Sequence, residues 1–277
     1  FKDAKISREE FRSLVAHATQ RGLQVVPKIS VLGHAERGMV WPAPLEDGPD
    51  LSDESNYAAL FNVMQEYIDD VRAAGGKAEY FHVGMDEASK TLLANMKKTG
   101  RPGGELLARH AQRVHAFLSR RKIRMVMYHD MLIGSGEKGY WREMGTSHAD
   151  ATESWRARPD IPRDVVLDYW NYEAFPRYRT VEGLIEEGFT FWLTPWMGDA
   201  VRSMSRAAIT MRQPGVVGST WSDSNYSFPA DKGPTWTAIH TRRWVSDAIG
   251  ATAEYSWNAN TPRIIERTLS FDPTAWL

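Results

Sequence analysis

Two adjacent carboxylates, Asp86 and Glu87, follow a run of strand-forming residues in the segment YFHVGMDEASK, residues 80–90. The two catalytic carboxylates of an ordinary glycosidase lie roughly 5 Å or more apart, on opposite sides of the bond that is cleaved. Successive side chains of a strand point to opposite faces, so neighbouring acids are not expected to flank one bond as acid and nucleophile. The spacing therefore predicts a separate task for each acid.

A nucleophile that belongs to the substrate would explain why the acids are neighbours. Glu87 would protonate the leaving oxygen, while the carbonyl oxygen of the sugar's own 2-acetamido group attacks the anomeric carbon. Asp86 would accept the amide N–H, orient the carbonyl and stabilise the positive charge that grows on nitrogen as an oxazolinium ring closes. Such substrate-assisted hydrolysis is a known exception to the scheme with two carboxylates.

Polar and aromatic side chains also stand where other predicted strands end. The candidate substrate-binding residues are His34, Glu36, Tyr128, Asp130, Trp170, Tyr172, Trp192, Trp196, Trp221 and Asp223. His82 lies inside a strand and is expected to have a supporting role, because a buried histidine usually has a hydrogen-bond partner. Sugar rings have apolar faces that stack on indole rings, so these aromatic residues suit a closed pocket around one terminal sugar.

The elements that must position these residues alternate along the chain. Apolar runs predict strands at 23–30, 77–84, 123–132, 164–172, 189–195 and 216–223. Helical spacing of apolar residues predicts helices at 7–21, 56–76, 106–121, 180–189, 198–215 and 235–250, the first of them starting at a capping box of Ser7 and Glu10. Strands and helices that alternate at this spacing predict parallel strands with crossover helices.

A (β/α)8 barrel fits this order better than a doubly wound open sheet. The residues at the strand ends would meet at one face of a barrel, where active sites of that fold are built. A doubly wound sheet normally carries a glycine-rich phosphate loop, and neither GxGxxG nor GxxxxGK occurs in the sequence. The strand count falls short of eight, so we expect residues 1–277 to form one catalytic barrel domain whose first one or two strands are missing.

The hexapeptide HVGMDE, residues 82–87, resembles the signature of glycoside hydrolase family 20, the β-N-acetylhexosaminidases. The version with Met85 resembles the bacterial branch of exo-acting N-acetylglucosaminidases. The likeness continues in VVPKISVLGHAE, RMVMYHDML, VVLDYWNYE and VVGSTWSDSN, which are similar to the third, fifth, sixth and eighth strand segments of that family. The resemblance covers most of the chain in the same order, and it implies a (β/α)8 barrel that removes a terminal N-acetylhexosamine.

The resemblance also implies roles for individual residues. Asp86 would orient the acetamido group, and Glu87 would act first as general acid and then as general base. Trp170 and Trp221 would wall the sugar pocket, and Asp223 would bind distal hydroxyls of the terminal sugar. His34 stands at the position of the family's histidine.

Two departures from the family pattern concern the sugar pocket. The arginine with which the family's first strand grips sugar hydroxyls has no counterpart, because the matching segment is absent from these 277 residues. Tyr128 stands where many members have a tryptophan. The tyrosine that binds the acetamido carbonyl is not placed by the sequence, and Tyr172, Trp192 and Trp196 are the candidates.

Two other classes of function fit part of the pattern. His34, His82, His129, Asp130 and Asp223 could ligate a metal, as in barrel amidohydrolases. That interpretation leaves the adjacent acids unexplained and lacks an HxH pair. A sugar-binding protein on a degenerate barrel is the other alternative, and the intact acids argue against it. The preferred mechanism needs neither a metal nor another cofactor.

The composition points to a neutral or weakly charged partner. Lysine and arginine number 34 against 35 for aspartate and glutamate, which predicts no overall attraction to nucleic acid or to an anionic membrane. The expected partner is a carbohydrate with a terminal N-acetylhexosamine, and the oligomeric state is left open. There is no apolar run of membrane-spanning length, and the first residues, FKDAKISREEF, lack the apolar core of a signal peptide. Cysteine is absent, and the compartment stays undecided with a slight preference for the cytoplasm.

Overall fold

The computed structural model describes residues 6–35, 40–45, 48–135, 137, 148–196 and 198–219. The chain divides into two compact units, which are Phe1–Leu167 with Glu187–Thr190 (unit 1) and Asp168–Glu186 with Phe191–Leu277 (unit 2). The boundaries between the units fall within strand β5, Val166–Trp170, after Glu186, and within strand β6, Thr190–Thr194.

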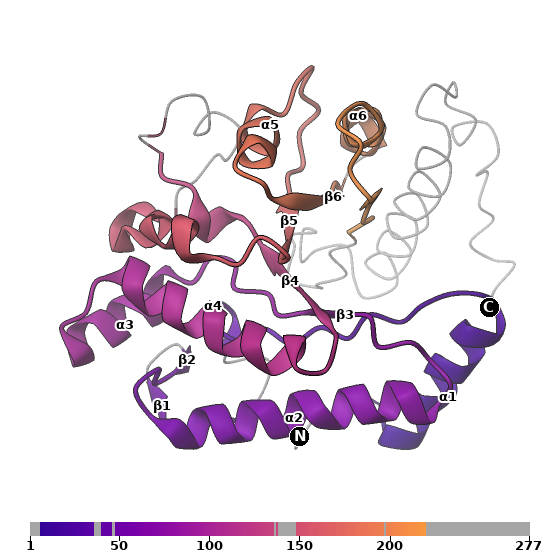
Figure 1. Cartoon of the computed structure of the whole chain (residues 1–277), viewed down its shortest axis with the longest axis horizontal. Helices are drawn as coiled ribbons and strands as arrows, with labels where there is room; N and C mark the ends of the chain where they lie inside the picture. The colour runs from indigo at the N-terminus through magenta and orange to yellow at the C-terminus, as the bar shows by residue number, and fades with distance from the viewer. Residues whose placement is uncertain are drawn as a thin grey trace, which may run out of the picture. The chain divides into compact units, whose positions relative to one another are not determined.

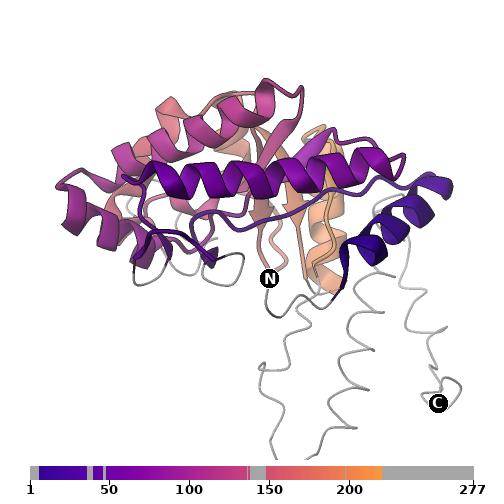
Figure 2. The ribbon, with the colours of Figure 1, turned by 90° about the horizontal axis from the view of Figure 1, so that it is seen from below.

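Unit 1 begins with helix α1, Arg8–Gln20, which starts at the predicted capping box. Ser7 Oγ accepts a hydrogen bond from the Glu10 N–H at 3.1 Å, and the Glu10 carboxylate accepts one from the Ser7 N–H at 2.6 Å. The helix packs on α2, Glu54–Ala73, the long purple helix of Figures 1 and 2. The predicted first two helices are thus confirmed, and α2 begins slightly earlier than expected because Asp53 caps it.

The strands of unit 1 are parallel, as predicted. Strand β3, Tyr80–His82, pairs with β4, Arg124–Tyr128, with Phe81 opposite Met125. On the other side of β3, the Ile29 N–H donates to the His82 carbonyl at 3.0 Å. The strand predicted at 23–30 is therefore present as an extended segment with one isolated bridge, Lys28 to His82, and not as a regular strand.

Helices α3, Ser89–Thr99, and α4, Gly103–Ser119, pack against each other in unit 1 (Figure 1). Helix α4 was predicted at 106–121, and it begins earlier, directly after Pro102. Gly103 and Gly104 lie against residues 152–157, where a Cβ atom would not fit. Two elements were not predicted from the sequence, namely α3 and a hairpin of β1, Pro44–Leu45, with β2, Gly48–Pro49. Short 3-10 helices at Asp130–Leu132 (η2), Asp150–Thr152 (η4) and Ser154–Asp160 (η5) complete the described part of unit 1.

Unit 2 continues the alternation of strand and helix. Strands β5, β6 and β7, Gly215–Val216, follow one another in the sheet, and β6 pairs with β7 in parallel. Helices α5, Arg179–Glu186, and α6, Gly198–Thr210, alternate with these strands (Figure 1). The predicted helix at 235–250 and the end of the strand predicted at 216–223 lie outside the described residues.

Buried apolar residues form the core of the sheet in each unit. In unit 1, Phe81, Val126 and Leu107 have no exposed surface, and in unit 2 Phe191 and Leu193 have none. Burial of such side chains stabilises the fold by about 1.5–3 kcal/mol each. Within the described ranges, each helix is too short or too polar to cross a lipid bilayer.

Candidate active site

The acids lie in a turn beyond the end of β3, not on the strand itself. The backbone has positive φ angles of 67° at Gly84, 74° at Met85 and 49° at Glu87. Non-glycine residues at such angles cost roughly 1–3 kcal/mol each and are frequent at functional sites. The assumption that Asp86 and Glu87 obey the alternation of a strand is therefore wrong, because the chain has already left the sheet.

His34 brings the two acids together. Its Nε2 atom lies 3.6 Å from Asp86 Oδ2 and 3.3 Å from Glu87 Oε2. The preceding Gly33 packs directly on the turn, where a Cβ atom would lie only 1.5 Å from the Asp86 carbonyl oxygen. Glycine at position 33 thus permits the close approach of the two loops, and this approach places the imidazole between the carboxylates.

Asp86 is the buried member of the pair, with 7% of its surface exposed. Its Oδ1 atom is buried and has no hydrogen-bond partner among the residues that the structure describes. Burial raises the pKa of Asp86 above its ordinary value, and the charges of His34 and Lys28 oppose this rise. A buried acceptor of this kind is costly unless a partner satisfies it, so Oδ1 is suited to receive a donor from a ligand.

Glu87 is half exposed and lies between two histidines. His34 faces its Oε2 atom, and His148 Nε2 lies 3.4 Å from its Oε1 atom. The hydrogen bond with His34 holds the pKa of Glu87 below its ordinary value, partial burial raises it, and the charge of His148 lowers it further. These contacts therefore favour the ionised form of Glu87.

Asp130 holds the turn of Asp86 and Glu87 through a backbone hydrogen bond. Its carboxylate has no exposed surface, and Oδ2 accepts a hydrogen bond from the Glu87 backbone N–H at 2.8 Å. A carboxylate that bonds a backbone N–H in a buried place fixes that backbone firmly. In this geometry Asp130 holds the backbone of Glu87, and the substrate contact predicted for Asp130 stays a prediction.

His82 and Tyr128 form a second layer beneath the acids. The Gly84 N–H donates to His82 Nδ1 at 3.0 Å, and the rings of His82 and Tyr128 meet edge to face with centroids 4.5 Å apart. Lys28 Nζ donates to the Tyr128 hydroxyl at 2.9 Å. His82 is thus buried and hydrogen-bonded, and its supporting role stays a prediction. Tyr128 is also buried, with 9% of its surface exposed.

Unit 2 holds an aromatic cluster of Trp170, Tyr172 and Trp196. The ring centroids of Trp170 and Tyr172 are 5.5 Å apart, and those of Tyr172 and Trp196 are 5.3 Å apart. All three side chains are partly exposed. Trp192, also partly exposed, lies on β6. Trp170, Tyr172 and Trp196 thus form the kind of partly exposed aromatic surface on which a sugar ring stacks.

Glu36, Trp221 and Asp223 lie outside the described residues. His148 and Lys28 were not predicted from the sequence. Lys28 stands in the extended segment before His34, so its position could have been noticed, but His148 lies far from any predicted strand end. Among the described residues, His, Asp and Glu side chains form no group of three or more that could hold a metal ion, and Asp223, proposed above as a ligand, is not among them.

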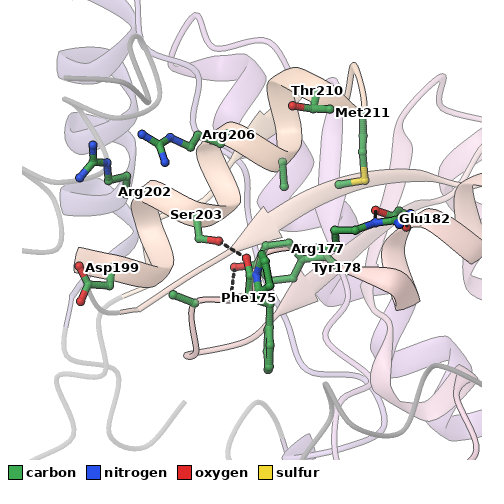
Figure 3. Close-up of a pocket in the computed structure, with 13 residues that line it drawn as sticks. Phe175, Arg177, Tyr178, Glu182, Asp199, Arg202, Ser203, Arg206, Thr210 and Met211 are labelled. Atoms are coloured by element: carbon green, nitrogen blue, oxygen red, sulfur yellow. Dashed lines mark hydrogen bonds and ion pairs between the residues drawn. The ribbon is translucent and has the colours of Figure 1, made fainter. Parts of the chain in front are cut away.

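A separate cavity of about 740 Å³ lies in unit 2 between the segment after β5 and helix α6 (Figure 3). Ser203 Oγ donates to the Phe175 carbonyl across it at 2.5 Å, and an ion pair of Arg177 and Glu182 lies at one side. None of the predicted site residues lines this cavity. It is therefore distinct from the aromatic cluster of Trp170, Tyr172 and Trp196.

Comparison with known proteins identifies the family. Residues 3–161 match the family described as glycosyl hydrolase family 20, catalytic domain, which is more than half of the chain. The chain belongs to glycosyl hydrolase family 20. The predicted family, glycoside hydrolase class and (β/α)8 barrel fold are thereby confirmed, and the described parallel strands and helices are consistent with part of such a barrel. The matched range of this family 20 domain includes the turn of Asp86 and Glu87, while Trp170 and all later residues lie beyond it.

Solved structures share the fold of this family 20 chain at low sequence identity. Dispersin B is 15% identical with a TM-score of 0.52, and the match covers 89% of this chain and 77% of that one. The exo β-N-acetylglucosaminidase of Vibrio harveyi is 17% identical with a TM-score of 0.54, covering 92% and 42%. The β-N-acetylhexosaminidase of Bacteroides fragilis NCTC 9343 is 17% identical with a TM-score of 0.56, covering 95% and 53%.

The chain therefore spans about half or less of the length of the Vibrio and Bacteroides proteins. A search of curated proteins found no match. The expectation that residues 1–277 form one N-terminally incomplete catalytic domain stays a prediction.

Proposed function

We propose that this chain is an exo-acting β-N-acetylhexosaminidase. It would release terminal N-acetylglucosamine or N-acetylgalactosamine from glycans or chito-oligosaccharides by substrate-assisted hydrolysis with retention of configuration. Membership of family 20 and the exo β-N-acetylglucosaminidase of Vibrio harveyi among the similar folds support this proposal.

The observation that carries the proposal is the buried Oδ1 atom of Asp86, which has no hydrogen-bond partner among the described residues. An acetamido N–H that donates to this atom would satisfy it and would aim the acetamido carbonyl oxygen at the anomeric carbon. As the oxazolinium ring closes, positive charge develops on the amide nitrogen, and an ionised Asp86 stabilises that charge where little water screens it. His34 and Lys28, whose charges lower the pKa of Asp86, favour this ionised form.

Glu87 would act in both halves of the reaction. In the first half its proton passes to the leaving oxygen as the glycosidic bond breaks and the carbonyl oxygen bonds to the anomeric carbon. In the second half its carboxylate takes a proton from the water that opens the ring. A bound sugar excludes solvent and so favours the protonated form needed first, while the two histidines favour the carboxylate needed second.

The aromatic residues are proposed to wall the pocket of the terminal sugar. Trp170 and Trp196 offer ring faces for stacking, and Tyr172 between them is our candidate for binding the acetamido carbonyl through its hydroxyl. Trp221 and Asp223 are retained as proposed contacts on the basis of the sequence alone. The closed pocket expected from the sequence would accept a chain end, which is the reason for proposing exo action.

Steady-state hydrolysis of chromogenic N-acetylglucosaminides and N-acetylgalactosaminides by the purified protein tests the proposal. Glu87→Gln should abolish turnover of a substrate with a poor leaving group and spare one with a good leaving group far more, because only the former needs a proton donor. Glu105→Gln is the matched control, since Glu105 lies on α4 in an exposed ion pair with Arg101. Equal losses on the two substrates would remove Glu87 from the acid role.

Exo action has its own test in a timed digest of a chito-oligosaccharide. Monomer should be released first, with the remaining chain shortened by one sugar at each step. Internal fragments that precede monomer would contradict the closed pocket.

A further inference from the structure

The Glu87 carboxylate has one histidine at each of its two oxygens. His34 Nε2 lies 3.3 Å from Oε2, and His148 Nε2 lies 3.4 Å from Oε1. The side chains of Glu87 and His34 are each 37% exposed and that of His148 is 29% exposed, so solvent reaches both contacts. Glu87 can donate a proton to a leaving group only if one of its carboxylate oxygens is accessible. One of the two imidazoles must therefore move away from its oxygen, or contact that oxygen together with the leaving group.

The two histidines are not held equally. His34 also faces Asp86 Oδ2 at 3.6 Å, has a φ of 53°, and follows Gly33, whose backbone is pressed against the Asp86 carbonyl. His148 comes from a different part of unit 1, the turn that leads into η4, Asp150–Thr152. Its ion pair in the described part of the chain is with Glu87, so it can move away without disturbing Asp86.

The oxygen that donates the proton must come within hydrogen-bond distance of the leaving oxygen. Since Oε2 is held by the fixed His34, the accessible oxygen is Oε1. We propose that His148 is a positioning residue on the leaving-group side, which holds Glu87 Oε1 and passes that place to the leaving sugar when the substrate binds. This inference rests on the proposed function and adds a residue that determines which leaving groups the site accepts.

The charged groups around Glu87 set the expected pH effect. The carboxylate is faced by His34 and His148, its backbone N–H is bonded by Asp130, and Asp86 adjoins it with Lys28 acting on that acid. The charge of His148 and its hydrogen bond to Glu87 both lower the pKa of Glu87. Without His148, Glu87 should keep its proton to higher pH, and the alkaline limb of kcat/KM should move upward.

The test uses two substrates that differ in the leaving group. His148→Ala should lower kcat/KM for N,N′-diacetylchitobiose on the order of tenfold, because the acid for a sugar leaving group is mispositioned. An aryl N-acetylglucosaminide, which hardly needs the acid, should lose much less. His148→Gln retains an N–H donor that cannot become charged, so it should recover much of the rate and shift the alkaline limb less than alanine does.

A matched control separates this effect from general loss of a histidine. His115 on α4 pairs with Asp164 at 2.9 Å outside the site, and His115→Ala should leave both rates and the pH profile unchanged. Carboxyl ¹³C NMR of glutamate-labelled protein gives a readout independent of turnover, in which the Glu87 signal should titrate at higher pH in His148→Ala than in the unaltered protein.

The outcomes distinguish the two proposals. Equal losses on the two substrates, or an unchanged Glu87 titration in His148→Ala, would overturn the role of His148 while leaving the proposed function intact. If the unaltered protein cleaves neither substrate, the proposed function fails and the leaving-group role fails with it. The Glu87 titration would still show whether His148 contacts the carboxylate.

Discussion

Replacement of Asp86 by asparagine removes a buried charge and keeps the shape of the side chain. If Asp86 acts on the acetamido nitrogen, its charge matters most when that nitrogen becomes cationic, so Asp86→Asn should lower kcat much more than it raises KM. Asp86 is 7% exposed, and its Oδ1 atom has no hydrogen-bond partner in the part of the chain that the structure describes, so little solvent reaches this contact.

The magnitude follows from the kind of contact. A hydrogen bond to a charged group contributes about 1.5–3 kcal/mol. Each 1.36 kcal/mol corresponds to a factor of ten in rate, so kcat should fall roughly 10- to 150-fold. KM should change by less than about threefold, because the uncharged acetamido group in the ground state gains less from the carboxylate.

The stability of Asp86→Asn should not fall as its kcat does. Burial raises the pKa of Asp86, which means that the folded protein disfavours its charge. Asp86→Asn should therefore leave the melting temperature unchanged or raise it. Asp70→Asn is the matched control, because Asp70 is equally buried and ion-paired to Arg8 and Arg12 at 2.8 and 2.6 Å, so its neutralisation should lower stability and spare kcat.

Steady-state kinetics on an aryl N-acetylglucosaminide and the inhibition constant of a thiazoline analogue of the cyclised intermediate complete the assay. The analogue should bind the unaltered protein far more tightly than N-acetylglucosamine does, and Asp86→Asn should lose most of that preference. A rise in KM with kcat unchanged, or an undiminished preference for the thiazoline, would refute the role given to Asp86.

Three further predictions concern the support of the site and the pH dependence of stability. Gly33→Ala should abolish turnover and destabilise the protein by about 1–3 kcal/mol or more, because its Cβ would lie 1.5 Å from the Asp86 carbonyl oxygen; wild-type activity in this variant would contradict the close packing. Asp130→Ala should lower both kcat and the free energy of unfolding, the latter by about 1–3 kcal/mol in urea titrations, because the Glu87 N–H loses its acceptor, and Asp130→Asn should recover much of both. Burial lowers the pKa of His110 to about 4, so the unfolded chain binds the extra proton first as pH falls. The contribution of His110, about 3 kcal/mol, should be present above pH 6.5 and disappear toward pH 4, and His110→Gln should flatten this part of the pH–stability curve.

Much of the fold follows from local patterns in the sequence. The capping box of Ser7 and Glu10 and the apolar runs of β3 and β4 are signals contained in a few neighbouring residues, and the structure confirms them. Helix α3 lacks such a signal, because the residue at its start, Ala88, makes no side-chain cap. The segment 23–30 is apolar enough for a strand, but its pairing is reduced to one bridge, and such a result depends on tertiary contacts.

The candidate site was predictable in its residue types and not in its geometry. The adjacency of Asp86 and Glu87 pointed to a separate task for each acid, but the positive φ of Met85 cannot be recognised from a methionine, so the alternation of a strand was applied to a turn. His148 reaches Glu87 across 61 residues of sequence, and no local pattern marks it. Contacts of this kind arise only from the packing of the whole unit.

The central claim is that the nucleophile belongs to the substrate. The most direct measurement compares hydrolysis of 4-nitrophenyl N-acetyl-β-D-glucosaminide with that of the matching β-D-glucoside, which has a hydroxyl in place of the acetamido group, at equal concentration and pH. We predict that the glucoside is nearly inert, because neither Asp86 nor Glu87 is placed to supply a nucleophile of its own. Hydrolysis of the glucoside at a rate comparable with that of the acetamido sugar would contradict the account.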